Sequence, residues 1–186
     1  IGQVRLPDQG GIVGQSGGAA MAAWVAEAMP PGRQVDAVVM LAVSLSRTYM
    51  LDEALRNTRR GIVNFYSPRD LVLVATRVSG TMDGSHGASA GRNGFEVPRT
   101  GGRPSAYQRL FQMPWNPQMS HTGHIGVHLT SGTSDFVATY VAPLVLGEQW
   151  DSDFISRVYT RRLIGPPSGR ATSPLPAPAP SPLASP

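Results

Sequence analysis

The sequence predicts an α/β fold in which a mainly parallel sheet is flanked by helices. Residues 36–45 and 61–67 are apolar and rich in β-branched side chains, which is typical of strands covered on both faces. A short β-favouring run, 11–14, predicts an earlier strand, and the alanine-rich run 17–29 after it predicts a helix. Residues 48–61 predict a second helix that ends at Gly61. Strands alternating with helices pair in parallel, because each helical crossover returns the chain to the same end of the sheet.

The second half of the chain predicts one more strand and one more helix. Residues 80–105 are rich in Gly, Ser and Arg and predict a long irregular connection, and residues 107–115 predict a strand. Ser134 caps the predicted final helix, and Asp135 in its first turn favours the positive helix end. Pro143 should kink this helix or distort its last turn, because proline lacks the N–H of the helical hydrogen bond.

Composition limits the organisation and the partners of the chain. Its 186 residues predict one domain, 1–165, and a Pro-, Ala- and Ser-rich tail, 166–186, that we expect to be disordered. No apolar run approaches the ~18 residues of a membrane-spanning helix. The absence of cysteine excludes disulfides and thiolate chemistry but leaves the compartment open. All sixteen basic residues are arginines, and their dispersion along the chain argues against nucleic-acid binding despite a net charge of +4.

A serine lies in the turn between the first predicted strand and the first predicted helix. Gly14-Gln15-Ser16-Gly17-Gly18 matches the pattern G-x-S-x-G, and this strand-to-helix context is typical of a nucleophile elbow. Such a turn exposes the serine hydroxyl, needs small residues at its two flanking glycines, and directs the N–H that follows the serine towards an oxyanion. A plain strand-to-helix turn is the alternative. A phosphate-binding loop is disfavoured, because the chain lacks lysine.

A serine nucleophile needs a base that an acid orients. Asp70 follows the predicted strand 61–67 by three residues, so its carboxylate should reach the same sheet edge as Ser16. Asp70 could instead serve as a turn residue, because Pro-Arg-Asp favours turns. Asp83 is the second choice for the acid.

The predicted base lies among the last three histidines, His121, His124 and His128. Glycines flank His124 on both sides and would let a loop bring its imidazole to the serine, so His124 is the first choice and His121 the second. A solvated loop histidine is the alternative. The spacing of the three histidines fits neither a helical pair nor a zinc finger, so no metal site is predicted.

Together these segments resemble the later half of an α/β-hydrolase, most of all the bacterial lipase- or esterase-like members. The resemblance covers the residues from 11 to 146 and is carried by 11–27, 36–46, 59–74, 80–91 and 121–144. It implies Ser16 as nucleophile, Asp70 as acid, His124 as base and the Gly17 N–H as an oxyanion donor. Gln15 stands where these enzymes more often have histidine.

The resemblance also carries expectations about completeness and function. In that fold several strands precede the elbow, whereas ten residues precede the first predicted strand here, so we expect a partial fold that lacks the N-terminal strands. The expected function is cleavage of a small-molecule carboxylic ester through a Ser-Asp-His triad and an acyl-enzyme, without a cofactor. The alternative is a non-catalytic α/β module that serves for binding or structure.

Overall fold

A computed structural model describes residues 10–98 and 105–161. Its sheet has four strands in the order β1-β2-β3-β4, and each neighbouring pair is parallel. The strands are β1 (Ile12–Gln15), β2 (Val35–Leu41), β3 (Thr58–Tyr66) and β4 (Leu110–Pro114). The predicted α/β class with a parallel sheet is therefore confirmed.

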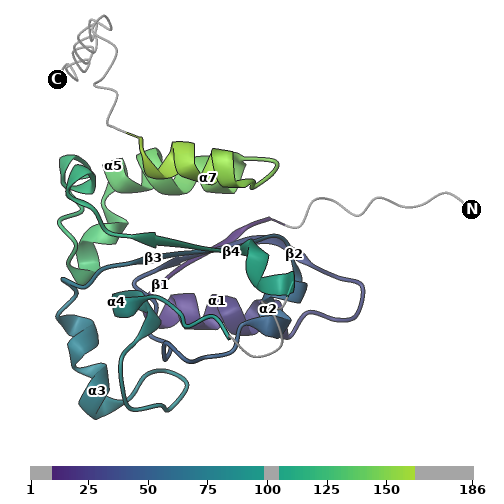
Figure 1. Cartoon of the computed structure of the whole chain (residues 1–186), viewed down its shortest axis with the longest axis horizontal. Coiled ribbons are helices and arrows are strands. Elements are labelled where there is room, and N and C mark those ends of the chain that lie inside the picture. Colours follow the sequence, from purple (N-terminus) through teal and green to yellow (C-terminus); the bar gives the residue numbers. More distant parts are fainter. Residues whose placement is uncertain (1–9, 99–104, 162–186) are drawn as a thin grey trace, which may run out of the picture.

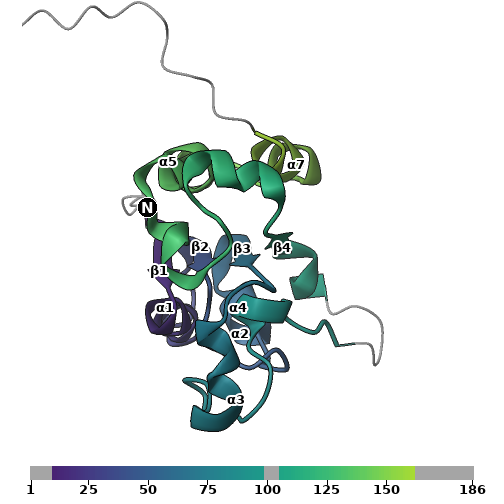
Figure 2. The ribbon, with the colours of Figure 1, turned by 90° about the vertical axis from the view of Figure 1, so that its left-hand side faces the viewer.

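Helices cover both faces of this sheet (Figures 1 and 2). One face carries α1 (Gly17–Glu27), α2 (Asp52–Arg56) and α4 (Ala90–Asn93); the other carries α5 (Ser134–Phe136), α6 (Ala142–Leu146) and α7 (Ser152–Tyr159). The short helix α3 (Thr76–Ser79) projects beyond the sheet edge at which the strands end.

Strand β2 contributes side chains to both hydrophobic cores. Val38 and Met40 pack into the core on the α1 side, whereas Val39 and Leu41 pack into the core on the α6 and α7 side. All four side chains are buried, because successive residues of a strand point to opposite faces and helices cover each face. This two-sided burial explains the continuous apolar run in the sequence.

Two predicted boundaries are wrong, and in each case the backbone of one residue adopts a positive φ that the prediction did not foresee. β2 stops at Leu41 because Ala42 adopts a positive φ of 49°, which an extended strand does not accommodate. Gly61 does not end a helix but lies inside β3, with φ of 117°. A β-carbon at Gly61 would overlap the carbonyl of Arg109, so glycine here permits a close approach of the neighbouring chain.

The final predicted helix exists, with differences at its start and its middle. Thr133, not Ser134, is the N-cap, while Asp135 does lie in the first turn. A π-helical turn, Val137–Val141, separates α5 from α6 just before Pro143, which agrees with the expected distortion. The sequence analysis missed α7, whose N-cap Asp151 accepts a 2.6 Å hydrogen bond from the Phe154 N–H.

The remaining segment predictions have mixed outcomes. Residues 80–98 contain turns and the single short helix α4, in agreement with an irregular connection, and 99–104 lie outside the described residues. The predicted tail, 166–186, also lies outside them. Within the described parts of the chain, no helix has both the length and the apolar character needed to cross a membrane.

Candidate active site

Ser16 occupies a strained turn between β1 and α1. Its φ of 54° and ψ of −121° lie in a region that residues other than glycine rarely adopt. A β-carbon at Gly14 would overlap the backbone of Gly18, so the turn requires glycine at position 14. A β-carbon at Gly18, by contrast, would meet no atom of the described residues within 4 Å outside its own helical turn.

Backbone hydrogen bonds fix the serine to the neighbouring strand. The Ser16 N–H donates to the Leu41 carbonyl at 2.9 Å, and the Ser44 N–H donates to the Ser16 carbonyl at 3.2 Å. Gly17 is the first residue of α1, and the first N–H groups of a helix have no acceptor within it. The Met82 side chain packs beside Gly17: a β-carbon there would lie 3.6 Å from its sulfur.

Asp70 lies in the turn after β3, at the same edge of the sheet. Its own N–H donates to the Ser67 carbonyl at 3.1 Å, and one carboxylate oxygen accepts from the Leu73 N–H at 3.2 Å. The other oxygen, Oδ2, lies 2.7 Å from Nδ1 of His128. The carboxyl group is almost completely buried, at 1% exposure.

His128, and not the first-choice His124, is therefore the histidine that the structure pairs with Asp70. A carboxylate can only accept hydrogen bonds, so Nδ1 of His128 donates to Asp70, and in a neutral imidazole this leaves the lone pair on Nε2. This is the tautomer that a general base needs. His128 is 8% exposed, which keeps the pair largely out of water.

His124 has a different environment, six residues before Thr130. Its Nδ1 lies 2.8 Å from the Thr130 hydroxyl, which donates its own hydrogen to the Val127 carbonyl, so His124 donates here. Its ring packs edge-on against Phe136, with centroids 4.5 Å apart. Burial lowers the pKa of His124 to about 4, and the charge of Asp70 opposes this only in part. His124 is a neutral buried histidine at neutral pH.

The two second-choice residues lie elsewhere. His121 is exposed, at the end of a 3-10 helix, Pro117–Thr122. Asp83 accepts from the Ser46 N–H at 2.9 Å and from the Ser85 hydroxyl at 2.8 Å, and so anchors its loop. Burial alone would raise the pKa of Asp83, but hydrogen bonds from Thr81, Ser46 and Ser85 lower it to about 2. Asp83 therefore has a structural task in a loop next to Met82.

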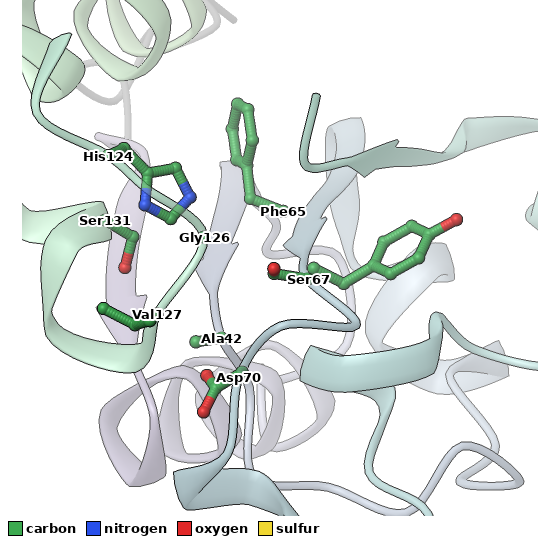
Figure 3. Close-up of a pocket in the computed structure, with 9 residues that line it drawn as sticks. Ala42, Phe65, Ser67, Asp70, His124, Gly126, Val127 and Ser131 are labelled. Atoms are coloured by element: carbon green, nitrogen blue, oxygen red, sulfur yellow. The ribbon is translucent and has the colours of Figure 1, made fainter. Parts of the chain in front are cut away.

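A small pocket adjoins the Asp70–His128 pair. Figure 3 shows His124 at one end of this pocket and Asp70 at the other. The wall between them includes Ala42, Phe65, Ser67, Gly126, Val127 and Ser131. In the described part of the chain, no three His, Asp or Glu side chains lie together as metal ligands would.

The serine turn, 14–18, and the histidine loop, 122–133, touch directly. The side-chain amide of Gln15 donates to the His128 carbonyl at 2.9 Å and lies 3.2 Å from the Ser131 hydroxyl. Sequence reasoning left His128 among three candidates and chose another. Every second residue from 122 to 128 is buried, and both His124 and His128 belong to this series. The alternation of buried and exposed residues therefore does not distinguish one histidine from the other.

Comparisons with protein families, with curated proteins and with solved structures found no match to this chain.

Proposed function

We propose that this protein is a serine hydrolase of the α/β-hydrolase type that cleaves carboxylic esters. The observation that carries the proposal is the buried Asp70–His128 pair, which Gln15 ties to the strained turn of Ser16. Serine, acid and histidine follow one another along the chain in the order typical of such hydrolases. Ser16 and Asp70 follow the carboxyl ends of parallel strands, and His128 lies in a loop that contacts Asp70 at the same edge of the sheet.

In the proposed reaction, Ser16 attacks the ester carbonyl while Nε2 of His128 takes the hydroxyl proton. Asp70 holds the imidazole in its tautomer and stabilises the imidazolium. The tetrahedral intermediate expels the alcohol, which receives the proton from His128 and leaves an acyl-enzyme on Ser16. A water molecule, deprotonated by His128, then attacks the acyl carbonyl, the bond to Ser16 breaks to release the acid, and His128 returns the proton to the Ser16 oxygen. The Gly17 N–H would stabilise the oxyanion, a contribution of typically ~3 kcal/mol per donor.

Side chains around this edge favour a substrate with an apolar group. Leu71 and Val72 follow Asp70, and Val127 and Leu129 flank His128; all four are exposed although apolar. Met82 is half-exposed beside Gly17. Exposed apolar side chains that gather around a site are typical of binding surfaces, so we propose small esters with an apolar acyl or alcohol part.

A fluorophosphonate probe tests the proposal, because it reacts with activated serines. We expect the wild-type protein to be labelled and Ser16→Ala to be unlabelled, with hydrolysis of a chromogenic butyrate ester lost in parallel. Ser79→Ala removes an exposed hydroxyl on α3 and should leave labelling unchanged. A folded wild-type protein that resists labelling would contradict the hydrolase and support the non-catalytic α/β module.

A further inference from the structure

Gln15 joins two segments that lie more than a hundred residues apart in the sequence. It is the last residue of β1 and lies opposite Leu41 in the register of the parallel pair. The next residue, Ser16, continues this register, since its N–H donates to the Leu41 carbonyl. The Gln15 backbone is therefore held by the sheet and provides a rigid starting point for its side chain.

The amide of Gln15 contacts the backbone of the histidine itself. Nε2 has two hydrogens, and its acceptors are the His128 carbonyl at 2.9 Å and the Ser131 hydroxyl oxygen at 3.2 Å. The Ser131 hydroxyl donates in turn to the His128 carbonyl at 3.3 Å. Three groups thus form a closed set of hydrogen bonds around one carbonyl. Ser131 is buried, so the loss of a donor would leave acceptors unsatisfied.

Other hydrogen bonds hold the histidine loop on either side of His128, and one holds the His128 imidazole. Trp115 donates its indole N–H to the His124 carbonyl at 2.8 Å, at the start of the loop. Asp70 holds the imidazole of His128 through Nδ1 and does not contact the His128 backbone carbonyl. Among these contacts, the Gln15 bond is the one that ties the backbone of His128 to the residue next to Ser16.

We propose that Gln15 is a positioning residue that sets the separation between the Ser16 hydroxyl and the His128 imidazole. The inference rests on the proposed function for its catalytic meaning. A neutral amide suits the task, because it donates to a carbonyl without placing a charge beside the imidazolium. A misplacement of about 1 Å in such a pair can lower a rate about 100-fold.

Gln15→Met removes the donor and keeps the length of the side chain. We expect the maximal rate of inactivation by the fluorophosphonate to fall about 10- to 100-fold, with the half-saturating probe concentration unchanged, because substrate groups do not touch Gln15 in the proposal. Gln15→His retains a donor and should recover part of the rate. The matched control is Gln34→Met, since Gln34 makes the same kind of bond, to the Arg56 carbonyl at 2.7 Å, on the exposed surface.

Hydrogen–deuterium exchange of residues 123–133 gives a readout that does not depend on activity. We expect faster exchange in Gln15→Met than in Gln34→Met, with β3 unchanged. If wild-type protein is not labelled but this loop loosens, the hydrolase is refuted and the structural link through Gln15 stands. Equal loop exchange in the two variants, or an unchanged inactivation rate in Gln15→Met, would overturn the inference.

If Gln15→Met does not fold, Ser131→Ala loosens the same hydrogen-bond set without changing β1, and the same outcomes apply.

Discussion

The serine turn and the histidine loop are two parts of the candidate active site that are built in opposite ways. The turn is determined within five residues. Gly14 lies so close to the Gly18 backbone that a β-carbon would not fit, and Ser16 between them adopts a positive φ. The histidine loop, 122–133, is held by residues far away in the sequence, which include Gln15 and Asp70. A local pattern therefore reveals the turn, whereas the loop can be understood only after the sheet has brought its partners together.

The two histidines of this loop show what distant partners decide. His124 and His128 are both buried, yet one donates to a threonine six residues later and the other to Asp70. Gly126, with φ of 90°, lies between them and packs so closely on Ser67 that a β-carbon would lie 2.9 Å from its hydroxyl oxygen. The chain can therefore pass the end of β3 at Gly126 and reach Asp70 at the next buried histidine.

The largest expected effect separates the two histidines. His128→Ala should lower the rate of ester hydrolysis about 10⁴- to 10⁶-fold, because it removes the proposed base. His124→Ala should lower it less than about 10-fold at equal folded fraction. Initial rates with a chromogenic butyrate ester measure both effects, and circular dichroism checks the fold. The reverse ranking would return the base to His124 and refute the role given to the Asp70–His128 pair.

The next effect tests how local the serine turn is. Gly14→Ala should cost about 3 kcal/mol or more in the free energy of unfolding, because the new methyl group overlaps the backbone of Gly18. Gly18→Ala should be neutral or slightly stabilising, since its methyl group meets open space and alanine favours helices. Urea denaturation gives both values. Equal losses at the two positions would show that the turn is not closed as described.

A third prediction concerns pH and the histidine loop. The unfolded chain protonates His124 below its ordinary pKa of 6.5, whereas in the folded protein burial lowers this pKa to about 4. The unfolded state therefore binds more protons between these values, and stability should fall by up to roughly 3 kcal/mol as the pH drops from 6.5 to 4. His124→Asn keeps a donor for Thr130 and removes the titration. Denaturation at several pH values gives the free energy of unfolding as a function of pH. This dependence should be flatter for the variant than for the wild type between pH 6.5 and 4, and identical dependences would contradict the prediction.

The smallest effect concerns the loop beside the serine turn. Asp83→Asn should cost about 1 kcal/mol at neutral pH, because the Ser46 N–H and the Ser85 hydroxyl lose a charged acceptor. The pKa of Asp83 is lowered to about 2, so this stabilisation exists above its ordinary 3.8 and is lost as the pH falls towards 2. Thermal melts of this variant and of the control Asp153→Asn, on the exposed start of α7, measure the difference. A control that melts as low as Asp83→Asn would remove the special role of that carboxylate.

Much of the fold could be predicted because its signals are local. Apolar β-branched runs marked β2 and β3, alanine marked α1, and alternation of strands with helices indicated parallel pairing. One of the errors arose where a distant neighbour controls the backbone. Gly61 looked like a helix end, but its conformation permits the close approach of the Arg109 backbone, which comes much later in the chain, just before β4. The helix α7 was missed although Asp151 provided a capping signal.

The sequence by itself determined the α/β class, the strained turn at Ser16 and the arrival of Asp70 at the same edge of the sheet. Each depends on hydrophobic period, small residues or chain order, all of which are local properties. Only the tertiary structure decided that Asp70 bonds His128, that His124 is buried as a neutral ring, and that Gln15 reaches the histidine backbone. These outcomes depend on hydrogen bonds between segments whose proximity exists only after the sheet has formed, and no spacing along the chain encodes them.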